Sequence, residues 1–186
     1  MKSFAILPLL LLLSFSVSTL VKTKVANGIT ISLPPELIPM TPDDIAQRFP
    51  SVRAPLAAFT NIDRLVDFSI NISATMWPDK DVPMAQKFFK ASLQNLYDRV
   101  DFIGEGTTVL RKNKFIFFEF ESRISGDRRK QELRQPVLKY TYIQYLVQND
   151  RTLVFSFSCP KDLMEEWQPV AREMMKSVTR ALSQVQ

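Results

Sequence analysis

The feature of the sequence that most limits its possible folds is an alternation of apolar and polar residues, clearest over residues 65–75. The apolar positions there are Val66, Phe68, Ile70, Ile72 and Ala74, and the polar positions are Asp67, Ser69, Asn71, Ser73 and Thr75. Because successive side chains of a β-strand point to opposite faces, this period of two predicts a strand with one dry face and one wet face. Similar segments separated by short polar turns predict hairpins, with further strands over residues 29–33, 56–60, 107–110, 115–124, 137–148 and 152–159.

Three other segments place apolar residues three or four positions apart, which is typical of helices that pack one face on a sheet. The first covers residues 41–49, where Thr41 and Pro42 suit the N-cap and the first helical position. The second covers residues 81–99, and we expect its sheet-facing residues to be Met84, Phe88, Leu93, Leu96 and Val100. The third covers residues 161–182, with an expected sheet-facing stripe of Leu163, Trp167, Val170, Met174, Val178 and Leu182.

The order of these segments predicts the fold class. Residues 138–145 are apolar on both faces, which indicates a central strand covered from both sides. We therefore expect an α+β fold in which an antiparallel sheet of about six to seven strands carries helices on both faces, an α/β/α sandwich. No repeat or interdomain linker interrupts residues 19–186, so we expect a single domain there, with residues 125–135 as a loop within it.

The first residues have the layout of a secretory signal peptide. Lys2 supplies a positive charge, residues 4–13 are almost entirely apolar, and residues 14–18 are small or polar. Ser16 and Ser18 would occupy the −3 and −1 positions, which predicts a signal peptide over residues 1–18 and cleavage before Thr19. The apolar run is shorter than the roughly 20 residues that span a bilayer, although an uncleaved anchor is the alternative. We expect an exported protein, periplasmic or extracellular, without stable membrane insertion after cleavage.

The composition argues against several classes of active site. The chain contains no histidine, which excludes Ser-His-Asp and Cys-His catalysis and histidine-ligated zinc. Its single cysteine, Cys159, permits neither an internal disulfide nor a thiolate metal cage, and we expect it to be buried. Only 4 of the 186 residues are glycine, which argues against a glycine-rich phosphate loop. We predict neither a cofactor nor a metal site.

Two parts of the sequence resemble the PsbP-like superfamily. One is Gly28-Ile29-Thr30-Ile31-Ser32-Leu33-Pro34, followed by a short helix. The other is Phe157-Ser158-Cys159-Pro160 with the later Glu166-Trp167-Gln168-Pro169-Val170-Ala171. The superfamily also includes a Ran-binding nuclear factor and the DcrB-type bacterial envelope proteins, although this chain lacks the lipidated cysteine of DcrB-like lipoproteins. The resemblance implies an α/β/α sandwich used for binding and assembly, with no shared catalytic residues.

An acidic pair is one candidate site. Glu119 and Glu121 share one face of a predicted strand, followed by Arg123. Two carboxylates within reach of each other could perform acid–base chemistry or hold a divalent cation. The simpler interpretation is that they are solubility residues on an exposed strand face, because a catalytic site needs groups that converge from several elements.

A basic segment is the second candidate site. Residues 123–134 contain five basic and two acidic residues, and the basic ones are Arg123, Arg128, Arg129, Lys130 and Arg134. Such a loop could bind an acidic protein surface, anionic lipid headgroups or an anionic glycan, or it could simply be solvated. Nucleic acid is not an expected partner, because no aromatic stacking platform lies among these charges.

The leading interpretation is therefore an exported, non-enzymatic PsbP-like domain that binds a protein partner in the cell envelope. A small-ligand or cation-binding periplasmic module is the first alternative, and Tyr140, Tyr142 and Tyr145 could line a ligand groove in that case. Core packing is the simpler role for these tyrosines. A hydrolase that uses Glu119 and Glu121 is the second alternative.

Overall fold

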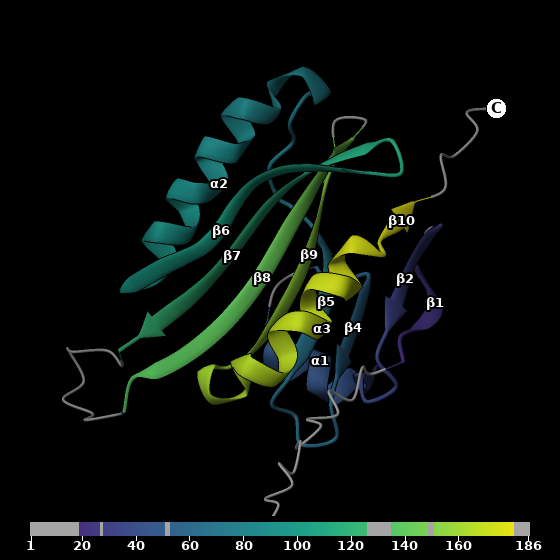
Figure 1. The fold of residues 1–186 in the computed structure, drawn as a ribbon, viewed down its shortest axis with the longest axis vertical. Coiled ribbons are helices and arrows are strands. Elements are labelled where there is room, and N and C mark those ends of the chain that lie inside the picture. The colour runs from purple at the N-terminus through teal and green to yellow at the C-terminus, as the bar shows by residue number, and fades with distance from the viewer. Residues whose placement is uncertain (1–18, 27, 51–52, 126–134, 149–150, 181–186) are drawn as a thin grey trace, which may run out of the picture.

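The structure is a computed structural model that describes residues 19–26, 28–50, 53–125, 135–148 and 151–180. Its main feature is a seven-stranded antiparallel sheet with the strand order β3-β4-β5-β9-β8-β7-β6 (Figure 1). The strands are β3 (Ile38–Pro39), β4 (Ala57–Thr60), β5 (Asp67–Ile72), β6 (Arg99–Leu110), β7 (Asn113–Ile124), β8 (Val137–Gln148) and β9 (Arg151–Pro160). A second sheet of three strands joins β1 (Val21–Ala26), β2 (Ile29–Leu33) and β10 (Thr179–Arg180).

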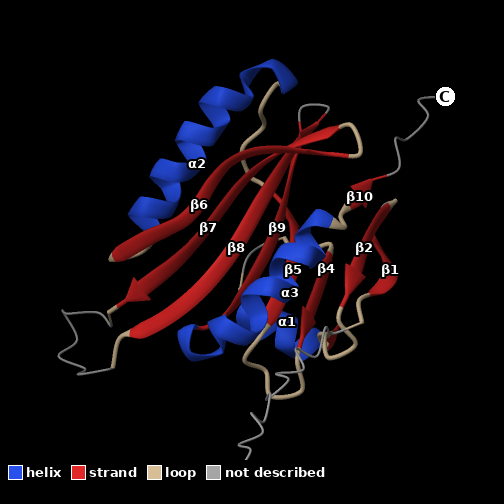
Figure 2. Ribbon diagram, in the orientation of Figure 1, coloured by secondary structure: helices blue, strands red, loops and turns tan. Residues whose placement is uncertain are grey.

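The described residues form three α-helices. Figure 2 shows them packed on this framework. They are α1 (Pro42–Arg48), α2 (Val82–Leu96) and α3 (Met164–Lys176), and short 3₁₀ turns, η1 (Asp79–Asp81) and η3 (Lys161–Leu163), precede α2 and α3. As predicted, Thr41 caps α1: its side chain accepts a hydrogen bond from the amide of Asp44, and the Asp44 carboxylate accepts one from the amide of Thr41. The α+β class with an antiparallel sheet is confirmed.

The predicted hairpins are present. β6 and β7 pair across a two-residue turn in which Arg111 and Lys112 have positive φ angles of 47° and 72°. Two consecutive left-handed residues match the right-handed twist of the strands that they connect. β6 begins at Arg99, eight residues earlier than predicted, because Gly104, Gly106 and a bulge at Ile103 break the alternation there.

The first core lies between one face of the large sheet, α3 and β2. Ile29 and Ile31 of β2 are fully buried, and the Trp167 ring of α3 stacks on Phe157 of β9 at 5.9 Å. The predicted dry face of β9, namely Leu153, Phe155, Phe157 and Cys159, belongs to this core. The last helix ends at Lys176 rather than at residue 182, because the chain turns into β10 and pairs with β2; Leu182 lies outside the described residues.

The second core lies on the opposite face, under α2. Phe89 of α2 stacks on Tyr145 of β8 with ring centroids 3.9 Å apart. The residues of α2 that are buried are Val82, Ala85, Phe89 and Leu93. The prediction that Met84, Phe88 and Leu96 face the sheet is therefore wrong, since they are 60%, 42% and 67% exposed. The helix carries two neighbouring apolar stripes, and the one that we expected to face the sheet is the exposed one. With α2 and α3 on opposite faces, β8 is the expected central strand, buried on both sides.

Candidate functional site

The basic candidate site lies at the end of the sheet where β7 stops and β8 starts. Arg123 is exposed near the end of β7 and lies in register with Arg99 of β6, which is 68% exposed. Ile124 of β7 pairs with Val137 of β8, so the basic segment leaves and rejoins the sheet at adjacent strands. Its other basic residues, Arg128, Arg129, Lys130 and Arg134, lie outside the described residues.

The acidic candidate site differs from its prediction. Glu119 and Glu121 do share one face of β7, but α3 and η3 cover this face, and Glu119 is only 4% exposed. Glu121 forms an ion pair with Lys161 of η3. The interpretation of Glu119 as an exposed solubility residue is therefore wrong, because α3 brings polar side chains onto the sheet at this point.

Four donor groups converge on the Glu119 carboxylate. The Tyr140 hydroxyl donates to Oε1 at 3.0 Å, and the Gln168 amide nitrogen donates to the same atom at 2.7 Å. Nε of Arg172 lies 3.1 Å from both carboxylate oxygens, and its terminal nitrogen Nη2 lies 3.0 Å from Oε1. These contacts link β7, β8 and α3, so the Glu119 carboxylate holds the helix against the sheet. We call this cluster of Glu119, Tyr140, Gln168 and Arg172 the clamp.

This environment also affects the neighbouring ionisable groups. Burial and the charge of Glu119 raise the pKa of Tyr140 well above its usual range, and they raise the pKa of Tyr142 to about 12. The hydrogen bonds to Glu119 raise the pKa of Arg172. Because its oxygens already accept this set of donors, Glu119 has the surroundings of a structural ion-pair partner rather than of a general base. Within the part of the chain that the structure describes, no group of three or more Asp, Glu or Cys side chains could hold a metal ion.

The remaining candidates occupy the core. Tyr140 and Tyr142 are buried in the first core, so the core role predicted for them is confirmed. Tyr145 is 6% exposed and stacks on Phe89 in the second core, but it also lines the trough described next, as the groove-lining alternative expected. Cys159 is 1% exposed, and burial raises the pKa of its thiol to about 12. The expectation of a buried cysteine is confirmed.

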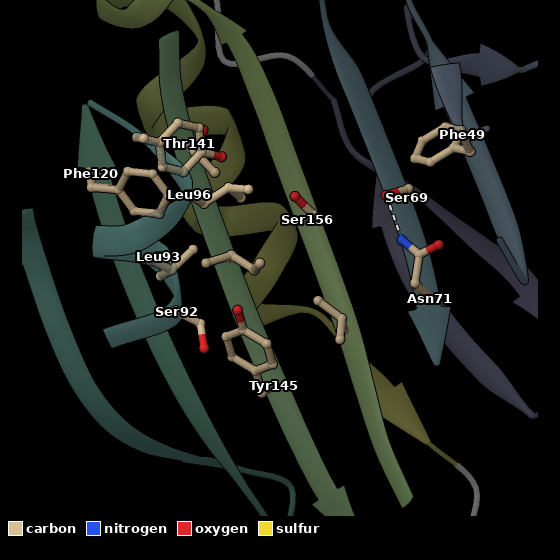
Figure 3. Close-up of a pocket in the computed structure, with 13 residues that line it drawn as sticks. Phe49, Ser69, Asn71, Ser92, Leu93, Leu96, Phe120, Thr141, Tyr145 and Ser156 are labelled. Atoms are coloured by element: carbon tan, nitrogen blue, oxygen red, sulfur yellow. Dashed lines mark hydrogen bonds between the residues drawn. The ribbon is translucent and has the colours of Figure 1, made fainter. Parts of the chain in front are cut away.

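A trough that the sequence did not predict lies on the α2 face of the sheet. It has a volume of about 440 Å³, with α2 on one side, Phe49 at the end of α1 on the other, and β8, β9 and β5 as its floor. Figure 3 shows Leu93 and Leu96 of α2 across the floor strands from Phe49. The floor includes Thr141, Ser156, Ser69 and Asn71, with the Asn71 amide donating a hydrogen bond to Ser69 at 3.0 Å (Figure 3).

A signal for this trough existed in the sequence. The wet face of the strand over residues 65–75 carries small, mostly uncharged residues such as Ser69 and Asn71, and α2 has a second apolar stripe beside its buried one. Each feature alone is compatible with simple solvent exposure. Only the topology places them side by side, because β5 joins the sheet next to β9, which is the last long strand of the chain. None of the helices in the described ranges has the length and apolar character needed to cross a membrane.

Comparisons with known proteins show the fold. No protein-family model and no curated protein matches the sequence. Among solved structures, the chain is similar to cyanobacterial PsbP (CyanoP) from Synechocystis sp. PCC 6803, with a TM-score of 0.59 and 10% identity over 90% of this chain and 96% of the other. The fold is PsbP-like.

The chain is also similar in fold to solved structures of Mog1. The Ran-binding protein Mog1p from Saccharomyces cerevisiae matches with a TM-score of 0.52 and 14% identity, covering 87% of this chain and 96% of the other. A variant of Mog1 gives a TM-score of 0.54 at 16% identity. At these identities the likeness establishes the PsbP-like fold alone.

Proposed function

We propose that this chain is an exported, non-enzymatic PsbP-like domain that binds a protein partner in the cell envelope. The observation that carries this proposal is the shared fold with Mog1p, which is a Ran-binding protein and matches most of both chains. The signal-like layout of residues 1–18 supports export. The role of Glu119 as a clamp supports a scaffold rather than a hydrolase, because the carboxylate faces donors of its own chain.

The basic end of the sheet is the proposed contact surface. Arg123 is exposed beside Arg99, which forms an ion pair with Asp101 of its own strand at 2.8 Å, and the segment between β7 and β8 adds four more basic residues in sequence. Clustered positive charge accelerates the encounter with an acidic partner and orients it, while contributing little to the stability of the fold. We therefore propose that Arg123, Arg128, Arg129, Lys130 and Arg134 face an acidic surface of the partner.

A pull-down from envelope extracts tests this proposal. The bait is the mature chain from residue 19 onward, and it is compared with the variant Arg128→Glu, Arg129→Glu, Arg134→Glu. We expect one dominant envelope protein on the wild-type bait and its loss on the variant, with the melting temperature unchanged. Equal capture by the two baits would contradict the role of the basic segment.

A matched control uses the opposite end of the same strands. Arg111→Glu, Lys112→Glu and Lys114→Glu reverse three exposed positive charges at the β6–β7 turn, so the net charge falls by the same amount. This variant should retain the partner. If both triple variants lose it equally, net charge rather than the proposed surface governs binding.

A small-ligand module is the second candidate function, and the trough is the observation that favours it. A volume of about 440 Å³ lies within the range of roughly 300–1,000 Å³ that is usual for ligand pockets. Thermal-shift measurements with a panel of uncharged small molecules would test it, and stabilisation abolished by Ser156→Leu would support it. No cation site accompanies the trough, since all the residues that line it are uncharged.

A further inference from the structure

The exposed apolar stripe of α2 is the first of four observations that bear on the trough. Met84, Phe88 and Leu96 stand on one line with Ser92, four residues apart. The three apolar side chains are 60%, 42% and 67% exposed. Residues four apart form the ridge that most often inserts into the groove of another helix. Trp77 packs on Phe88 with ring centroids 5.4 Å apart, whereas Met84 and Leu96 stay exposed, so α2 carries a packing ridge that the described residues cover only in part.

The C-terminal half of the ridge borders the trough. Ser92 and Leu96, its last two residues, line the trough together with Leu93 (Figure 3). On the other flank of α2, Lys90 forms an ion pair with Glu105 of β6 at 2.6 Å. Because Lys90 reaches the β6 edge, the ridge must lie on the side of α2 that faces β9 and β5. The ridge thus continues the wall of the trough along the helix.

The floor of the trough determines which kind of peptide can lie there. β8, β9 and β5 are interior strands, each paired on both sides. An extended peptide gains its affinity by pairing with a free strand edge, and this floor offers none, so the backbone of such a peptide would be left without partners. A helix satisfies its own backbone hydrogen bonds and needs only a surface for its side chains. The occupant that fits this floor is a helix.

The charges around the trough determine the character of that helix. The face that enters the trough must be uncharged, because the trough lining offers no charged group that could compensate a buried charge. The charged residues of α2 are Lys87 and Lys90, with no Asp or Glu between Val82 and Leu96. Lys90 is neutralised by Glu105, but Lys87 is exposed beside the ridge and makes no ion pair with a described residue. An acidic flank on the occupant would complement Lys87.

We infer that the trough between α2 and α1 binds an amphipathic helix of the partner protein, with its apolar face on the α2 ridge and acidic residues beside Lys87. The inference rests on the proposed function, in that it assumes a protein partner. It assigns that partner a second contact, distinct from the basic end of the sheet.

A designed peptide tests the inference without knowledge of the partner. The probe is a fluorescent amphipathic helix of about 18 residues, roughly 27 Å long, with leucine on one face and glutamate on the other. We expect saturable binding to the mature chain, and amide chemical-shift changes confined to α2, β5, β8 and β9. Two control peptides, a proline-containing isomer that cannot form a helix and a version with lysine in place of glutamate, should bind at least about tenfold more weakly.

Two equally exposed apolar residues provide matched variants. Leu96 lies on the ridge and Val109 lies on β6 away from the trough, and both are 67% exposed. Leu96→Glu should weaken binding of the acidic helix about tenfold or more, whereas Val109→Glu should leave it within about twofold. Neither change removes a buried side chain, so both variants should fold. Absence of binding to the wild type, or equal effects of the two variants, would overturn the inference.

The same variants separate this inference from the proposed function. If the envelope partner is captured by the wild type and by Leu96→Glu alike, the trough is not its contact, although the binding function stands. If the wild-type chain captures no envelope partner, the proposed function fails whatever the peptide does. Stabilisation by small uncharged molecules together with no peptide binding would overturn the helix inference in favour of a small-ligand site.

Discussion

Among single residues, Glu119 has the largest consequence for the fold. It is a nearly fully buried carboxylate, and the donors that hold it come from β8 and from α3. When one member of such a pair is removed, the remaining polar groups lose their partner and retain the cost of desolvation. Tyr140 is the group most affected, because it is fully buried and water cannot replace the lost acceptor.

We predict that Glu119→Ala lowers the free energy of unfolding by about 1–3 kcal/mol, because the buried Tyr140 hydroxyl loses its acceptor while Arg172, which is 44% exposed, can be solvated. Glu121→Ala should cost at most about 1 kcal/mol, because Glu121 is 26% exposed, against 6% for Glu119, and its partner Lys161 is 46% exposed. Urea denaturation of the two variants measures the difference. Equal losses would contradict the clamp, and a Glu119→Ala variant as stable as the wild type would do so more strongly.

The buried tyrosine and thiol groups predict a loss of stability in alkali. The pKa values of Tyr142 and Cys159 are both raised to about 12 in the folded chain, from ordinary values of 10.0 and 9.0. Below pH 9 both groups are protonated in the folded and unfolded states, so their full contribution to stability is present. Above pH 9 for Cys159, and above pH 10 for Tyr142, the unfolded chain releases a proton that the folded chain retains up to about pH 12. Over those ranges each group lowers the free energy of unfolding by about 1.4 kcal/mol per pH unit.

The prediction is an unfolding free energy that is flat from pH 7 to 8 and falls from about pH 9 to 12. Tyr142→Phe should make the decline above pH 10 shallower by about 1.4 kcal/mol per pH unit. Denaturant titrations at each pH provide the values, with circular dichroism as the probe. A decline of the same steepness in the variant would show that Tyr142 ionises normally in the folded chain.

The sequence could predict part of this residue-level arrangement. Alternation along β7 correctly placed Glu119 and Glu121 on one face, because the period of a strand is fixed by its backbone. It could not show that α3 lies over that face, since Gln168 and Arg172 are distant in sequence and look like ordinary polar residues of a surface helix. The clamp is visible only once the two elements pack.

Among the elements, α3 depends most on one side chain. Trp167 is 7% exposed and stacks on Phe157 in the first core, as its place in the predicted stripe indicated. Truncation of a buried tryptophan removes a large apolar contact and leaves a cavity. We predict that Trp167→Ala lowers the free energy of unfolding by about 3–5 kcal/mol.

Trp77 offers a control for that prediction. It contacts Phe88 and Phe89 at the margin of the second core and is only partly buried. Trp77→Ala should therefore cost clearly less than Trp167→Ala in the same denaturant titration. The reverse order would mean that α2, rather than α3, is the element on which the fold depends.

The helices also show why hydrophobic periodicity alone does not predict which face of a helix is buried. In α2, the two stripes at Val82, Ala85, Phe89 and Leu93 and at Met84, Phe88 and Leu96 both satisfy helical spacing. Periodicity alone cannot choose between them, because the choice depends on which stripe meets the aromatic face of β7 and β8. The start of β6 was missed for another reason: its glycines and its bulge interrupt the apolar–polar alternation of the sequence, although every residue of the strand except Ile103 has a partner in β7.

At the scale of the whole molecule, hairpin order was enough to predict an antiparallel sheet with helices on both faces. The strand order could not be predicted from the sequence, because 78 residues separate the end of β5 from the start of β9, with which it pairs. That pairing creates the floor of the trough, so the trough could not be predicted from the sequence either. Export remains a prediction that rests on residues 1–18.

We predict that the protein recovered from the envelope or the medium begins at Thr19. Intact-mass measurement decides between this form and a chain that starts at Met1. Replacing Ser18 by Pro should block cleavage and retain the longer form, since small residues are required next to the cleavage site. If the wild type and Ser18→Pro both keep Met1, the N-terminal segment is an uncleaved anchor.

We propose that this chain binds an envelope protein through the basic end of its sheet. The measurement that tests this most directly is photocrosslinking in living cells, with a photoreactive residue placed at Arg123 or at Lys114 near the opposite end of β7. We expect one discrete crosslinked envelope protein from position 123 and none from position 114. The absence of a crosslink at 123, or the same products from both positions, would contradict it.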